Sequence, residues 1–96
     1  MIKGLYKERD KMTKQSEKID HNNPELLSEI ADMCDYIDEV KTYTRYFDDE
    51  YKQLVDLRLK GYTYEKIALE SNFSRITVIR KLNKFENSLM NSYNQL

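Results

Sequence analysis

Apolar residues recur at helical spacing along much of the chain. In residues 24–47 the series runs at intervals of four and three without a break: Leu26, Ile30, Met33, Ile37, Val40, Thr44 and Phe47. That period is typical of a helix that packs one side along a seam. Residues 2–19 repeat it more weakly, because polar residues interrupt the series Ile2, Leu5, Arg9, Met12, Ser16 and Ile19. We therefore expect helices over 2–19 and 24–47.

Capping and breaking residues divide the chain at two further points. In the run from His21 to Glu25, Asn23 is suited to cap a helix and Pro24 to open it. Acids at 48–50 favour a new helix N-terminus, and a third amphipathic segment runs from Tyr51 to Gly61, which suits a left-handed stop. The segment could continue the preceding helix or be kinked from it. With only two glycines and one proline, the predicted fold class is all-α. An N-terminal helical hairpin or coiled-coil-like pair (1–47) would precede a three-helix helix-turn-helix module (48–96).

Residues 62–82 carry the most specific local pattern. Thr63 is placed to cap a short helix, and Ala68 offers a small side chain where a second helix would cross. Asn72 tolerates the positive φ of a tight turn, Phe73 would plug that turn, and Ser74 would cap the next helix. This order indicates a helix-turn-helix. Its second helix would turn an apolar stripe inward, made of Val78, Leu82, Phe85 and Leu89.

The same stretch resembles region 4 of bacterial sigma factors. Ile67-Ala68, Asn72-Phe73-Ser74-Arg75, Thr77-Val78 and Leu82 stand where that family carries Ile-Ala, Gly-Ile-Ser and Thr-Val. Residues 54–58 and 61–65 are similar too, so the matched positions extend over 54–82, within the segment 48–90, about 40 residues long, that resembles the family. The size and order of the segments resemble phage-encoded regulators of the ArpU and RinA type.

Two positions depart from the sigma region 4 pattern. Asn72 replaces the usual glycine, at little cost. Ser71 occupies a position usually filled by a core leucine, while Leu69 stands where a polar residue is common. We expect the helix before the turn either to be rotated or to expose Leu69.

Charge is distributed unevenly, although the net charge is only −1. Residues 1–18 carry +3, residues 19–50 carry −8 and residues 51–96 carry +4, and residues 74–85 hold four basic and no acidic side chains. We predict that helix 75–90 reads the major groove, with Arg75 and Thr77 at base edges and Ile76 at a thymine methyl. Phosphate contacts are expected from Arg80, Lys81 and Lys84, with backbone contacts from Thr63 and Tyr64.

Helix 24–47 has more apolar surface than the partly polar helix 2–19 can cover. We therefore predict a homodimer, which would also bring two recognition helices together. The alternative is that the module 48–96 folds back over the stripe in a monomer. The acidic side of this helix is interpreted as a solvated face or, alternatively, as a docking surface for a basic partner: Asp32, Asp35, Asp38 and Glu39.

Other chemistries receive little support from the sequence. There is no glycine-rich phosphate loop, and no nucleophile with a candidate histidine base, so an enzyme is not expected. His21 and Cys34 are the only histidine and the only cysteine, which argues against a metal, and no cofactor is predicted. No apolar run reaches the roughly 20 residues that span a bilayer, so we expect no membrane partner and a cytoplasmic location.

These observations predict a sequence-specific regulator of transcription that binds double-stranded DNA and is encoded by a phage or mobile element. A contact with RNA polymerase is compatible with the resemblance. Two alternatives stay open. One is a protein-interaction module that uses the helix-turn-helix shape on a protein, consistent with the pI of about 5.8. The other is the DNA-binding subunit of a packaging or recombination machine.

Overall fold

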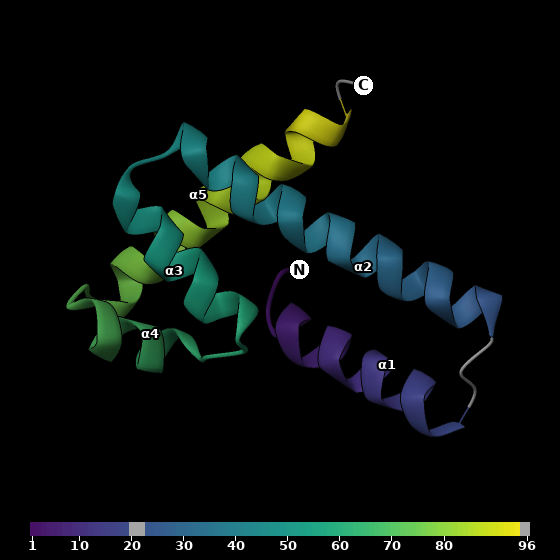
Figure 1. The fold of residues 1–96 in the computed structure, drawn as a ribbon. Coiled ribbons are helices and arrows are strands. Elements are labelled where there is room, and N and C mark those ends of the chain that lie inside the picture. The colour runs from purple at the N-terminus through teal and green to yellow at the C-terminus, as the bar shows by residue number, and fades with distance from the viewer. Residues whose placement is uncertain (20–22, 95–96) are drawn as a thin grey trace.

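The computed structural model describes residues 1–19 and 23–94, and every regular element in those two ranges is a helix. The elements follow in the order α1 (Leu5–Ile19), α2 (Pro24–Tyr43), the 3-10 turn η1 (Thr44–Tyr46), α3 (Asp49–Leu59), α4 (Tyr64–Ser71) and α5 (Arg75–Asn94). The predicted all-α class is confirmed. α1 and α2 run antiparallel side by side, and α3 and α4 lie at one end of this pair (Figure 1). None of the described helices is both long and apolar enough to cross a membrane.

The start of α2 follows the sequence prediction. The side-chain oxygen of Asn23 accepts hydrogen bonds from the backbone N–H groups of Glu25 and Leu26, at 3.0 and 3.2 Å. Pro24 occupies the first helical position, where no intrahelical bond from its nitrogen is needed. His21, which the sequence placed in the same break, lies outside the described residues.

The end of α2 differs from the sequence prediction of one helix over 24–47. The α-helix stops at Tyr43, and η1 follows until Phe47 adopts an extended backbone with φ −127° and ψ 171°. The Phe47 ring then packs 5.3 Å from Phe85 and 4.8 Å from Tyr51, between ring centroids. A continuing helix would carry Phe47 away from these rings, so long-range aromatic packing sets this boundary.

One buried core contains residues from all five helices. α2 contributes Ile37 and Val40, which are 1% and 0% exposed, and the neighbouring Thr44 is buried too. The C-terminal half of the α2 stripe is therefore covered within the chain, as the monomer alternative expected. Its N-terminal half, with Leu26, Ile30 and Met33, stays half-exposed. The other buried apolar residues are Ile2, Leu5, Tyr51, Leu54, Val55, Leu57, Leu59, Ile67, Val78, Leu82, Phe85 and Leu89.

The N-terminal segment is tied to the end of α3 by contacts that no periodicity indicated. The carbonyl oxygen of Arg58 accepts from the backbone N–H groups of both Gly4 and Gly61, each at 2.9 Å. Both glycines have positive φ, +76° and +92°, and a side chain on Gly61 would lie 3.5 Å from the Gly4 Cα. Glycine is thus favoured here by its backbone conformation, since 3.5 Å is an ordinary van der Waals contact that a side chain could make. The predicted left-handed stop at Gly61 is confirmed.

A second link between α1 and α3 is polar. The Tyr6 hydroxyl donates a hydrogen bond to the Asp56 carboxylate at 2.9 Å. Burial, and then this bond to an anion, raise the pKa of Tyr6 to about 12. Because the neutral phenol is the donor, the stabilisation from this contact is complete up to about pH 10, the ordinary pKa of tyrosine, and is lost as the pH rises through about 12.

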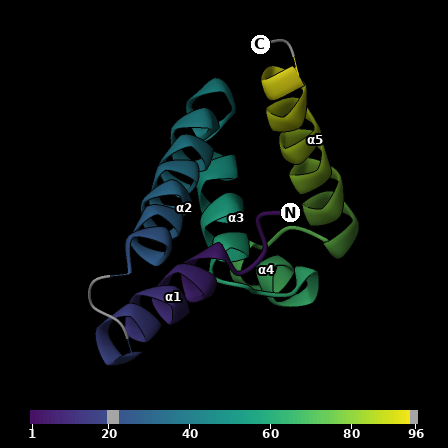
Figure 2. The same cartoon turned by 90° about the vertical axis from the view of Figure 1, so that its right-hand side faces the viewer.

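α5 crosses α2 near the C-terminal end of α2 (Figures 1 and 2). Tyr43 stands at this crossing. Its ring meets Phe85 edge-on at 5.7 Å between centroids, and its hydroxyl lies 2.7 Å from the Ser88 hydroxyl and 3.1 Å from the Ser88 carbonyl oxygen. The orientation of α5 is therefore fixed by one apolar and one polar contact.

Candidate nucleic-acid interface

Short-range contacts shape α4, the turn and the start of α5. The Thr63 hydroxyl accepts from the backbone N–H of Lys66 at 3.2 Å and caps α4. Asn72 then adopts the left-handed conformation, with φ +64°. Ser74 caps α5 by accepting from the backbone N–H of Thr77 at 3.1 Å, and it also donates to the Thr77 hydroxyl at 2.8 Å. The predicted caps and the positive φ at Asn72 are confirmed.

The departures at Ser71 and Leu69 have a structural explanation. Ile67 is fully buried, and Ser71, one turn later, faces the same way. Its hydroxyl donates to the Ile67 carbonyl oxygen at 2.7 Å and accepts from the backbone N–H of Phe73 at 3.4 Å, which satisfies a polar group where an apolar one is usual. Leu69 is 82% exposed. The expected exposure of Leu69 is thus confirmed.

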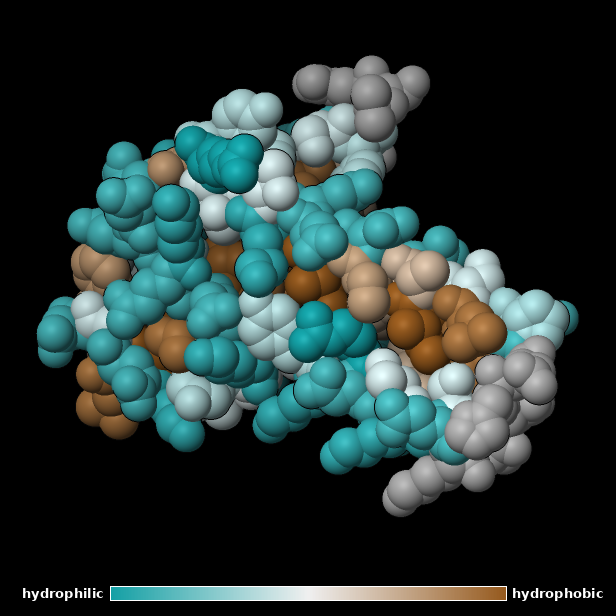
Figure 3. Space-filling view, viewed as in Figure 1, coloured by the Kyte–Doolittle hydropathy of each residue, from teal (hydrophilic) through white to brown (hydrophobic). Residues whose placement is uncertain are grey.

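α5 has a buried and an exposed side. The predicted inward stripe is confirmed, since Val78, Leu82, Phe85 and Leu89 are all buried. On the other side Ile76, Arg80 and Lys84 follow one another at intervals of four and are exposed, with Ile76 at 73%. At the end of the molecule where α4 lies, isolated hydrophobic side chains (brown) stand among hydrophilic ones (teal) on the surface (Figure 3). This side of α5 therefore offers a cationic surface with an apolar residue near its start.

Arg75, the first residue of α5, contacts α4. Its Nε donates to the Glu65 carboxylate at 2.6 Å, and both side chains are more than half exposed. The pKa of Glu65 is held below its ordinary value by its own backbone N–H and by this bond to Arg75. Glu65 is therefore ionised at neutral pH and pairs with the predicted base-reading side chain.

Lys81 lies back against α3 in this structure. Its ammonium is 3.5 Å from the Glu50 carboxylate and stands over the rings of Tyr51 and Phe73, at 5.1 and 5.5 Å from their centroids. Only 22% of its side chain is exposed. The three residues predicted to contact phosphates are therefore not equivalent. Lys81 is paired with a carboxylate, whereas Arg80 and Lys84 form no ion pair with any part of the chain that the structure describes.

The remaining predicted contact residues flank this surface. Thr63 is exposed and serves as a cap. Tyr64 is half-buried, with the Arg58 guanidinium 3.9 Å from its ring centroid. Thr77 is half-buried, and its hydroxyl accepts from Ser74.

Two acidic residues at this surface escaped the sequence prediction. Glu65 and Glu50 each lie in the first turn of a helix, where an acid is common without any partner on another helix. Their partners lie on other helices, so neither periodicity nor local spacing indicates the pairing. The positive surface of α5 is therefore bordered by carboxylates on α3 and α4.

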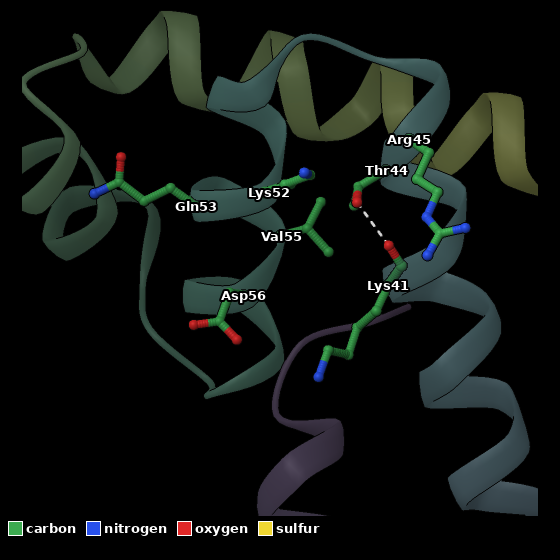
Figure 4. Close-up of a pocket in the computed structure, with 7 residues that line it drawn as sticks. All are labelled: Lys41, Thr44, Arg45, Lys52, Gln53, Val55 and Asp56. Atoms are coloured by element: carbon green, nitrogen blue, oxygen red, sulfur yellow. Dashed lines mark hydrogen bonds between the residues drawn. The ribbon is translucent and has the colours of Figure 1, made fainter.

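A cleft of about 490 Å³ between α2 and α3 is a different candidate site (Figure 4). Three cations line it, but they diverge: Lys41 runs towards α1, where its ammonium is 5.9 Å from the Tyr6 ring centroid, and Arg45 extends away from Lys52. The cleft's carboxylate, Asp56, is already engaged by Tyr6 and by Lys60 at 3.2 Å. These side chains have neither a nucleophile with a base nor a convergent anion site.

The side chains that commonly bind metal ions are not grouped into a site in residues 1–19 and 23–94. No group of three or more His, Cys, Asp or Glu side chains in these ranges is arranged to hold an ion. Cys34 is a free, half-buried thiol on α2.

The surface formed by α4, its turn and the exposed side of α5 is thus the candidate that best combines exposure, charge and defined geometry. Exposed cations lie there together with the exposed Leu69 and Ile76, opposite the buried stripe of α5. Comparison of the whole chain with family models, with curated proteins and with solved structures finds no match, so its function is inferred from its own residues.

Proposed function

We propose that this protein binds double-stranded DNA, with α4, the turn 72–74 and α5 acting as a helix-turn-helix. The observation that carries the proposal is the exposed side of α5, where Arg75, Arg80 and Lys84 stand opposite a buried apolar stripe and residues 74–85 contain no acidic side chain. A helix of this kind fits the major groove of B-form DNA, and its cations replace counterions on the phosphates.

The proposed contacts divide by their position on α5. Arg75 and Ile76 stand in the first turn, which reaches base edges in helix-turn-helix proteins, and Thr77 is next to them. Arg80 and Lys84 lie further along the helix, where an exposed cation meets the sugar-phosphate backbone. Lys81 would have to leave Glu50 to make the same contact.

Arg80→Ala and Lys84→Ala are expected to weaken binding to every duplex and to reduce the slope of log affinity against log salt by about one unit each, as a lost phosphate contact does. Arg75→Ala should instead weaken the preferred duplex by about 1–3 kcal/mol and relax the preference at one base pair. Fluorescence anisotropy over a salt series measures both effects. The matched controls are Arg45→Ala and Lys14→Ala, which remove exposed cations elsewhere.

Equal effects of the control and α5 substitutions would mean that binding follows net charge alone. The absence of salt-dependent binding to any duplex by the parent protein would reject DNA binding. In that case Leu69 and Ile76, which are 82% and 73% exposed, favour the alternative of a protein-interaction module.

The biological role that fits this proposal is transcriptional regulation in the cytoplasm by a phage or mobile element, with RNA polymerase as a further partner. This role is supported by the resemblance of residues 54–82 to sigma region 4. The same residues include α4, the turn 72–74 and the start of α5, which form the candidate surface. The alternative role as the DNA-binding subunit of a packaging or recombination machine uses the same surface. Mapping the sites that the protein protects across its own genome separates the two, because a regulator protects promoters.

We also propose that the protein is a homodimer that pairs through the N-terminal half of α2. A groove of about 610 Å³ between α1 and α2 is lined by half-buried apolar side chains, among them Met12, Leu26 and Met33, and it appears as a brown band along the helix pair (Figure 3). Leu27 beside it is 47% exposed. Polar and acidic side chains line the groove as well: Glu8, Gln15, Glu29 and Asp32. What supports pairing here is the strip of apolar side chains that stays partly exposed between them.

Leu27→Glu is expected to convert the dimer into an 11.6 kDa monomer, because it would place a charge inside the pairing surface. Leu69→Glu, at the more exposed leucine of α4, should leave assembly unchanged. Sedimentation equilibrium at micromolar concentration measures both. A parent protein that stays monomeric as its concentration rises would contradict the dimer.

A further inference from the structure

The bond between Arg75 and Glu65 leaves a particular part of the guanidinium free. Glu65 accepts from Nε, so the edge formed by the two terminal nitrogens makes no hydrogen bond within the described part of the chain. An arginine presents five N–H donors in a fixed planar fork. With Nε engaged, the fork still offers a pair of parallel donors, which matches the O6 and N7 acceptors of a guanine.

Both residues are held at defined positions on the surface. Glu65 lies in the first turn of α4, after the Thr63 cap, and Arg75 is the first residue of α5, after the Ser74 cap. The turn between them is fixed by the left-handed Asn72. The carboxylate therefore approaches Arg75 from one side only and limits the directions that its long side chain can take.

We propose that Glu65 is a positioning residue that orients the Arg75 guanidinium to donate two hydrogen bonds to a guanine in the major groove. This inference rests on the proposed DNA binding. Glu65 itself makes no contact with the base. It restricts the Arg75 side chain before binding, so that less conformational entropy is lost when the complex forms. Its negative charge also repels nearby phosphates.

The two effects of Glu65 have different signatures. An ionised carboxylate near DNA weakens binding to every duplex, so its removal should strengthen all binding about two- to five-fold. Orientation of Arg75 affects only the guanine position. Glu65→Ala loses both effects, whereas Glu65→Gln loses the charge but keeps an oxygen that accepts from Nε.

The experiment compares binding of these variants to a duplex selected by the parent protein from a randomised pool, and to the duplexes in which the Arg75-dependent base pair is changed. Glu65→Ala is expected to reduce discrimination at that base pair about three- to ten-fold, and Glu65→Gln to keep it within about two-fold. Glu70→Ala is the matched control, because it removes an exposed acid from the same helix and should leave discrimination unchanged. In an Arg75→Ala background, Glu65→Ala should no longer affect discrimination.

Two results would overturn the inference while leaving DNA binding in place. One is discrimination by Glu65→Ala equal to that of the parent, and the other is improved discrimination, which would make Glu65 a competitor for Arg75. Failure of the parent protein to bind any duplex would overturn the proposed function as well, so the two failures are distinguishable. Thermal unfolding of each variant identifies any loss that comes from unfolding, since an exposed pair contributes little to stability.

Discussion

Ile37→Glu is expected to unfold the protein. Ile37 is 1% exposed and belongs to the core that joins all five helices. The substitution removes a buried aliphatic side chain and puts a carboxyl group in its place, with no cation opposite it among the core residues. We expect a loss of at least about 4 kcal/mol in the free energy of unfolding, from the combined cost of lost packing and of a buried ionisable group. Chemical denaturation followed by circular dichroism measures this loss.

Ile76→Glu is the matched control for this prediction. It makes the same chemical change at an isoleucine that is 73% exposed, so the free energy of unfolding should change by no more than about 0.5 kcal/mol. A folded Ile37→Glu protein as stable as Ile76→Glu would show that the C-terminal half of α2 does not pack in the core. Because Ile37 is buried within one chain, its substitution is not a test of dimer formation, and Leu27 serves that purpose.

The parts of the fold that could be predicted from sequence depend on residues close together in the chain. The caps at Asn23, Thr63 and Ser74 and the positive φ of Asn72 each involve contacts within three residues. The inward side of α5 follows from helical periodicity alone. These features were predictable because local chemistry leaves few alternatives.

The features that sequence patterns missed depend on long-range packing. α2 ends at Tyr43 because Phe47 packs against Phe85, far along the chain. Gly4 meets Gly61 because the N-terminal segment folds against the end of α3. Neither contact has a periodic signal. A prediction from one sequence therefore placed the helices well, but it was wrong about where α2 ends and contained no indication of what anchors the N-terminus.

The candidate interface shows the same division. Periodicity placed Ile76, Arg80 and Lys84 on the outer side of α5, and they are exposed. It also grouped Lys81 with them, yet that side chain pairs with Glu50 on α3. Whether a cation on a helix is free or paired depends on which carboxylates neighbouring helices bring to it, and this is set by how the helices cross.

Phe85→Ala is expected to remove about 3–5 kcal/mol from the free energy of unfolding, the range measured for a fully buried phenylalanine. Phe85 is 0% exposed, and its ring contacts Tyr43 and Phe47, with centroid distances of 5.7 and 5.3 Å. The substitution would therefore leave a cavity where α2, the segment before α3 and α5 meet. Tyr46→Ala is the control, because Tyr46 touches the same aromatic group but is 80% exposed, and a change of about 0.5 kcal/mol is expected there.

The effect of Phe85→Ala on DNA affinity separates folding from recognition. Phe85 lies on the inner side of the helix whose outer side carries Arg80 and Lys84, so it makes no proposed contact with DNA. Affinity should fall only to the extent that the folded fraction falls, and the salt slope of the folded fraction should equal that of the parent, since no phosphate contact is lost. A reduced salt slope in folded Phe85→Ala protein would mean that the inner side of α5 contacts DNA, and the orientation proposed for this helix would then be wrong.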